Sequence, residues 1–173
     1  MPLYLKKSLA MLFLVFATLI NACSTGKALD PKHEDNKPII QGQMNWEAWQ
    51  ARAGWHDYSA KDFNTSPVLI NQISSMLKRG AYEFLIFAGS WCEDSESEVP
   101  KIFKILKSAQ TPDDKIRLVG VDRDKKSGSG IETPYKIEKV PTLVILENGK
   151  EKGRIVEFPT NSWEEDILEI FIK

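Results

Sequence analysis

The stretch 83-EFLIFAGSWCEDSESEVP-100 places a cysteine where a buried strand gives way to a helix. Residues 83–88 form a short apolar run that ends at a glycine, as is typical of a strand buried on both faces. Apolar residues then recur at helical spacing from about Trp91 to Lys107. Cys92 therefore lies in the first turn of the predicted helix, where unpaired N–H groups and the helix dipole stabilise a thiolate. The thiolate is the form of cysteine that attacks disulfides.

The remaining segments predict an α/β fold. Helices are predicted over 44–54, from 66 to 80 and from Asn161 or Ser162 onward, and strands over 115–121, 142–146 and 154–158. Asn148-Gly149 is a hairpin turn, and the polar segment 122–130 is a loop. The order helix, strand, helix, strand, hairpin, helix predicts a central mixed sheet with helices on both faces.

Two stretches together resemble the thioredoxin family. In that family, W-C-x-x-C follows the central strand and a proline lies eight residues after the first cysteine. Trp91, Cys92 and Pro100 match this pattern. The second stretch, 135-YKIEKVPTLVILENGK-150, is similar to the family's Y-x-I-x-x-V-P-T-L segment with its N-G turn. The resemblance covers about residues 67–173 and implies a thioredoxin-like three-layer fold.

The resemblance also implies where a substrate would bind. In the family, the proline after valine or isoleucine is cis and lies against the active cysteine. Here that proline is Pro141, and the backbone of Val140 would pair with an extended substrate. The predicted substrate-binding residues are therefore Trp91, Val140 and Pro141.

The sequence departs from the family at the second cysteine. Ser95 occupies that position, and its hydroxyl cannot resolve a mixed disulfide but can at best donate a hydrogen bond to the Cys92 thiolate. The buried acid that assists the second thiol in the family is replaced by Ile86. The predicted catalytic residues are Cys92 and Ser95, in a monothiol thiol-disulfide oxidoreductase that needs an external resolving thiol.

Acidic residues crowd the start of the helix after Cys92. They are Glu93, Asp94, Glu96 and Glu98. Acids in a first turn stabilise a helix, but they oppose a thiolate beside them. At about 7 Å and a dielectric of 40–80, each costs the thiolate roughly 0.6–1.2 kcal/mol. The helix dipole and the acids are therefore expected nearly to cancel.

Other interpretations of Cys92 stay open. A redox-silent thioredoxin-fold module could bind an exported client protein, or Cys92 could be a small half-buried apolar residue. A peroxiredoxin-like site fits poorly because Gly89 stands three residues before Cys92, where that site needs Thr or Ser. A Cys/His hydrolase fits poorly because His33 and His56 lie far along the chain. No metal site and no cofactor are predicted, since the acids after Cys92 are more typical of helix capping.

The N-terminus resembles a bacterial lipoprotein signal. Two lysines precede the apolar run 9-LAMLFLVFATLI-20, which is too short to span a bilayer but suits a signal peptide. Ile20-Asn21-Ala22-Cys23 then resembles a lipobox, with Asn21 where a smaller residue is commoner. The resemblance implies cleavage before Cys23 and acylation of its thiol, palmitate being one such acyl group. It places the protein in the cell envelope, on the outer membrane facing the periplasm if the source is Gram-negative.

These features divide the chain into four parts. They are a signal peptide (1–22), a lipid-anchored flexible linker (23–40), a Trp-rich helical extension (41–65) and a thioredoxin-like domain (66–173). With 23 basic and 24 acidic residues, the chain lacks the excess of positive charge that is typical of proteins that bind nucleic acid. Without Cys23, Cys92 is the one remaining thiol, so an intramolecular disulfide is excluded. The expected partners are exported proteins with cysteines or disulfides, and the membrane through the lipid on Cys23.

Overall fold

A computed structural model of the protein describes residues 37–55 and 60–173. The predicted signal peptide, Cys23 and most of the predicted linker lie outside these residues. The α-helices are α1 (Trp46–Ala53), α2 (Pro67–Leu77), α3 (Glu93–Ser108) and α4 (Trp163–Ile172). The 3-10 turns are η1 (Asp113–Lys115) and η2 (Thr133–Tyr135). The strands are β1 (Gly42–Met44), β2 (Tyr82–Ala88), β3 (Ile116–Gly120), β4 (Thr142–Glu147) and β5 (Lys150–Val156).

The five strands form one mixed sheet in the order β1-β3-β2-β4-β5. Strand β2 is central, parallel to β3 and antiparallel to β4, and the outer pairs are antiparallel. Ile86 is paired with Leu118 on one side and with Leu143 on the other. The predicted α/β architecture with a mixed sheet is therefore confirmed.

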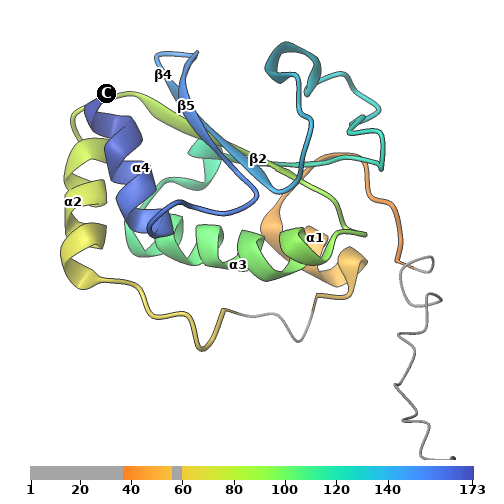
Figure 1. Ribbon diagram of the computed structural model, residues 1–173, viewed down its shortest axis with the longest axis horizontal. Helices are drawn as coiled ribbons and strands as arrows, with labels where there is room; N and C mark the ends of the chain where they lie inside the picture. The colour runs from red at the N-terminus through yellow and green to blue at the C-terminus, as the bar shows by residue number, and fades with distance from the viewer. Residues whose placement is uncertain (1–36, 56–59) are drawn as a thin grey trace, which may run out of the picture. The chain divides into compact units, whose positions relative to one another are not determined.

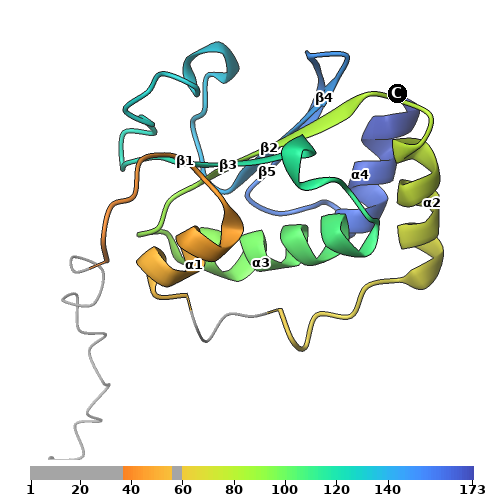
Figure 2. The same ribbon diagram turned by 180° about the vertical axis from the view of Figure 1, so that it is seen from behind.

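The two faces of the sheet are covered differently. Alternate residues of β2 enter separate cores: Phe84 and Ile86 pack with side chains from all four α-helices, whereas Leu85 and Phe87 pack with residues of the segment 121–140. Figures 1 and 2 show the helices gathered on one side of the sheet and this segment on the other. Helices were expected on both faces of the sheet. The four α-helices all lie on the first face, and the second face is covered by the segment 121–140, whose one helical element is the 3-10 turn η2. The glycine- and serine-rich sequence before η2 forms the predicted loop.

Local sequence signals explain the helix ends and the hairpin. Asn45 accepts a hydrogen bond from the Ala48 N–H at 2.8 Å, and Gly54 ends α1 with a positive φ of 70°. Ser66 and Ser162 cap α2 and α4 in the same way. Asn148 and Gly149 both have positive φ, as a tight β4–β5 hairpin requires.

The positions of two strands were not predicted. Residues 42–44 form β1, which pairs with β3, so the segment predicted as a helical extension also supplies an edge strand. Within that segment, Trp49 and Trp55 are fully buried in the helix-side core. Strand β5 begins at Lys150, four residues before its predicted start, because its exposed polar residues hide the strand pattern.

Among the described residues, no helix has the length and hydrophobicity needed to cross a membrane.

Candidate functional site

Cys92 lies at the end of β2, as the N-cap residue of α3. Its backbone is extended, and its N–H donates to the Gly89 carbonyl at 3.0 Å. The side chain is free and partly exposed, and it packs against the core that also contains Val140. The Cys92 Sγ lies 3.4 Å from the Val140 carbonyl oxygen, to which its thiol donates. The Val140–Pro141 bond is cis, as the family resemblance implied.

Ser95 does not contact Cys92 through any hydrogen bond found in the described residues. Its side chain is fully buried, and its Oγ accepts from the Gly89 N–H at 3.2 Å. Ile86, where the family has an acid, is also fully buried. The structure therefore places Ser95 as a support for the turn that carries Cys92.

Trp91 packs against the segment that follows β3. Its Nε1 donates to the Val121 carbonyl at 3.0 Å. Arg123 and Lys125 lie over the indole, with the guanidinium carbon 5.0 Å and the ammonium nitrogen 5.6 Å from the ring centroid. Trp91 thus brings two cations to the loop next to Cys92, a feature that sequence analysis missed because 30 or more residues separate them from Trp91.

Comparison with known proteins identifies the family of the chain. The family model described as Thioredoxin matches residues 45–168, which is more than half of the chain. The chain belongs to the thioredoxin family. The match includes α1, part of the segment that was predicted as an extension.

Solved structures similar to this thioredoxin-family chain share little sequence with it. One is a protein of unknown function from Pseudomonas aeruginosa, with 14% identity, a TM-score of 0.44, and coverage of 74% of this chain and 84% of that one. Another is a mutant thioredoxin from Halobacterium salinarum, with 17% identity, a TM-score of 0.37, and coverage of 58% of this chain and 80% of that one. No curated protein sequence matches the chain.

The four acids after Cys92 are not equivalent. Glu96 forms an ion pair with Lys37 at 2.6 Å, and Glu98 turns inward, where its Oε2 accepts from Trp163 Nε1 at 2.8 Å and its Oε1 pairs with Lys101 at 2.5 Å. Burial alone would raise the pKa of Glu98, but the hydrogen bonds from Lys101, Trp163 and Ser97 outweigh it and lower the pKa. The acids whose carboxylates make no ion pair within the described residues are Glu93 and Asp94. The opposition to a thiolate is therefore weaker than four acids would imply.

A buried carboxylate fixes the loop on the second face of the sheet. Glu132 is 5% exposed and accepts a hydrogen bond from the Ser127 hydroxyl. Burial alone would raise the pKa of Glu132, but the Ser127 hydroxyl and backbone N–H groups lower it. This contact holds the segment that carries Arg123 and Lys125.

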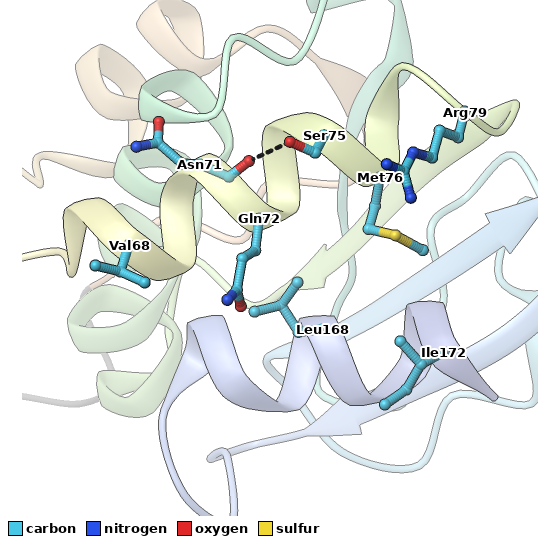
Figure 3. A pocket seen from close by; sticks show the side chains of 8 residues that line it. All are labelled: Val68, Asn71, Gln72, Ser75, Met76, Arg79, Leu168 and Ile172. Carbon is cyan, nitrogen blue, oxygen red and sulfur yellow. Dashed lines mark hydrogen bonds between the residues drawn. The ribbon is translucent and has the colours of Figure 1, made fainter.

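The described residues offer no metal centre, since no group of three or more His, Cys, Asp or Glu side chains among them is placed to hold an ion. A groove of about 650 Å³ lies between α2 and α4, and Figure 3 shows apolar side chains of both helices along it, among them Val68, Met76, Leu168 and Ile172. None of the predicted site residues lines this groove. The predicted site residues lie instead around the start of α3 and the Val140–Pro141 bond.

Proposed function

We propose that this thioredoxin-family chain is a monothiol thiol-disulfide oxidoreductase. The observation that carries the proposal is the position of Cys92: a partly exposed thiol at the N-terminus of α3, with Sγ 3.4 Å from the carbonyl of Val140. The helix N-terminus favours the thiolate, and the Val140 backbone beside it offers a polar edge to an extended peptide.

The reaction would take place in two exchanges. The Cys92 thiolate attacks one sulfur of a client's disulfide, forming a mixed disulfide and releasing the client's other thiolate. A thiolate from outside the chain then attacks the client's sulfur in this mixed disulfide, so that Cys92 leaves as a thiolate and the client is released as a mixed disulfide with the outside thiol. Because a serine stands at position 95, the resolving thiol cannot come from that position.

The cellular setting of the proposal follows from the N-terminal sequence. Acylation at Cys23 would tether the protein to a membrane in the cell envelope, and its clients would be exported proteins with cysteines or disulfides. This part is tested by expressing the full chain and its Cys23→Ser variant in a bacterium, and by following incorporation of a labelled fatty acid. Label on the unmodified chain alone supports the tether, and label on neither chain excludes it.

The enzyme proposal is tested by turnover. The full chain with Cys23→Ser, kept in mild detergent, has Cys92 as its only thiol. It is added to a peptide disulfide with excess 2-mercaptoethanol, and multiple turnovers are expected. Cys92→Ser should abolish them, whereas Ser97→Ala, which changes an α3 residue bonded to Glu98, should keep them. Rates equal to those without protein would overturn the proposal.

A redox-silent binding module is the second candidate. It is favoured by the hydrogen bond from the Cys92 thiol to the Val140 carbonyl, which stabilises the protonated sulfur, and by the acids Glu93 and Asp94 beside it. In that case, client binding would be the same with Cys92→Ser as with the unmodified thiol. Loss of client capture in the Cys92→Ser variant would exclude this candidate.

A further inference from the structure

A segment that precedes the matched thioredoxin region lies across the Cys92 site. Residues 37–44, here called the strap, run past the ends of β2 and β3 before pairing with β3 as β1. The side chain of Ile40 is 1% exposed in the helix-side core. Figure 2 shows the strap beside the end of the sheet where α3 begins. The strap is therefore part of the folded domain.

The strap contacts three separate segments of the site. Ser90, two residues before Cys92, is fully buried, and its Oγ accepts from the Ile40 N–H at 3.0 Å and donates to the Pro38 carbonyl. The Gln41 amide donates at 2.9 Å to Asp122 in the loop that carries Arg123 and Lys125. At the strap's start, Lys37 Nζ lies 2.6 Å from Glu96 Oε2, in the first turn of α3. These contacts fix one cation of the strap beside the helix end that bears Cys92.

We infer that Lys37 is a positioning residue for the reaction of Cys92, acting through Glu96. Glu96 follows Cys92 by one helical turn, and its N–H donates to the Cys92 carbonyl at 3.0 Å. Its carboxylate, 13% exposed, would oppose the thiolate if it were unpaired. Lys37 neutralises this charge, and Ser90 holds the strap in the register that brings Lys37 to Glu96.

Other charges surround the same thiol and stay unchanged in the test. They are Glu93 and Asp94 on α3, Arg123 and Lys125 over Trp91, and Lys139 beside Val140. Lys139 is paired with Glu157 at 2.6 Å, so its charge is partly offset. Removal of Lys37 therefore changes one charge in a fixed environment. At about 10 Å and a dielectric of about 40–80, one unit charge changes the thiolate population about two- to fourfold.

The test measures the rate at which iodoacetamide, a neutral reagent, alkylates Cys92 at pH 7 in the full chain with Cys23→Ser. Lys37→Met is expected to slow alkylation about two- to fourfold. Glu96→Gln should not slow it, and the double variant, in which neither charge remains, should return to the rate of the parent protein. Lys107→Met is the matched control, because Lys107 pairs with Asp113 at the far end of α3, about 20 Å along the helix from Cys92, and its rate should equal that of the parent protein.

The role of Lys37 rests on the proposed function, but the experiment distinguishes a failure of this role from a failure of the oxidoreductase proposal. Equal slowing by Lys37→Met and Lys107→Met, or no restoration of the parent rate in the double variant, overturns the role of Lys37. If the alkylation rates follow the expected pattern while none of the proteins turns over a peptide disulfide, the role of Lys37 stands and the oxidoreductase proposal falls.

Discussion

Replacing Gly120 by alanine tests the close approach of the strap to the sheet. Gly120 ends β3 opposite Gly42. A Cβ at Gly120 would lie 2.4 Å from the Ile40 carbonyl oxygen and 2.7 Å from Trp49 Cζ3, well inside van der Waals contact. The first of these atoms is backbone and cannot rotate away. Gly120→Ala must therefore either deform the buried contact or displace the strap.

The structure sets the size of both responses. Overpacking of a buried contact costs about 1–3 kcal/mol. Displacing the strap would expose Ile40, which costs about 1.5–3 kcal/mol, and break the two Ser90 hydrogen bonds at about 0.5–1.5 kcal/mol each. Since the less costly response prevails, Gly120→Ala should lower the free energy of unfolding by about 1–3 kcal/mol, toward the upper end because the Ile40 carbonyl oxygen is a backbone atom.

Urea unfolding followed by tryptophan fluorescence measures this loss. Gly149→Ala is the control: its Cβ would meet no atom within 4 Å, but its φ of +75° should cost about 1 kcal/mol. If the strap is released in the native state, the m-value should also fall, because less surface remains to be exposed on unfolding. A loss for Gly120→Ala no larger than that for Gly149→Ala would refute the close packing of the strap.

Further predictions concern buried carboxylates and the missing thiol. Trp163→Phe removes the hydrogen-bond donor that lies 2.8 Å from the buried Glu98 carboxylate. It should lower the free energy of unfolding, measured by thermal unfolding, by about 1.5–3 kcal/mol, and a decrease of less than about 0.5 kcal/mol would contradict this. The pKa of Glu98 is lower in the folded state than its ordinary 4.5. The stabilisation that ionised Glu98 gives to the fold should therefore be complete above about pH 4.5 and should decrease as the pH falls. In the Trp163→Phe variant, the free energy of unfolding should decrease less over this acidic range. Ser127→Ala should raise the pKa of Glu132, as followed by NMR titration of the carboxyl group. It should also lower the free energy of unfolding in urea by about 1–3 kcal/mol. A pKa of Glu132 that stays the same in the variant would count against the Ser127–Glu132 contact. Ser95→Cys should confer dithiothreitol-dependent reduction of insulin, and its absence would show that the buried site at position 95 does not bring two sulfurs together.

The fold and the position of Cys92 could be predicted because their signals are local. The apolar run before Gly89, the helix caps at Asn45 and Ser66, and the Asn148-Gly149 turn each depend on neighbouring residues, and all are present in the structure. Helix α3 begins at Glu93, two residues after its predicted start, so that Cys92 is the N-cap residue and not part of the first turn.

The surroundings of Cys92 could not be predicted because they depend on long-range contacts. Lys37 and Glu96 are 59 residues apart, and Ser90 and Ile40 are 50 apart. No periodicity connects such pairs, and β1 is too short, at three residues, to show alternation. The family resemblance implied that Ser95 is a partner of Cys92, whereas its side chain is buried and its hydroxyl accepts a hydrogen bond from the Gly89 N–H.

Strand β1 also protects the sheet from other chains. Exposed edges with unpaired N–H and C=O groups are templates for intermolecular pairing. At the opposite edge, β5 carries charged side chains such as Lys150, Glu151 and Arg154, which discourage such pairing. The β3 edge is instead covered by the three residues of β1, and a fragment cut to the matched region at residue 45 would uncover it. That fragment would expose the backbone of Leu118 and Val119 and is therefore expected to aggregate more readily than the chain that keeps β1.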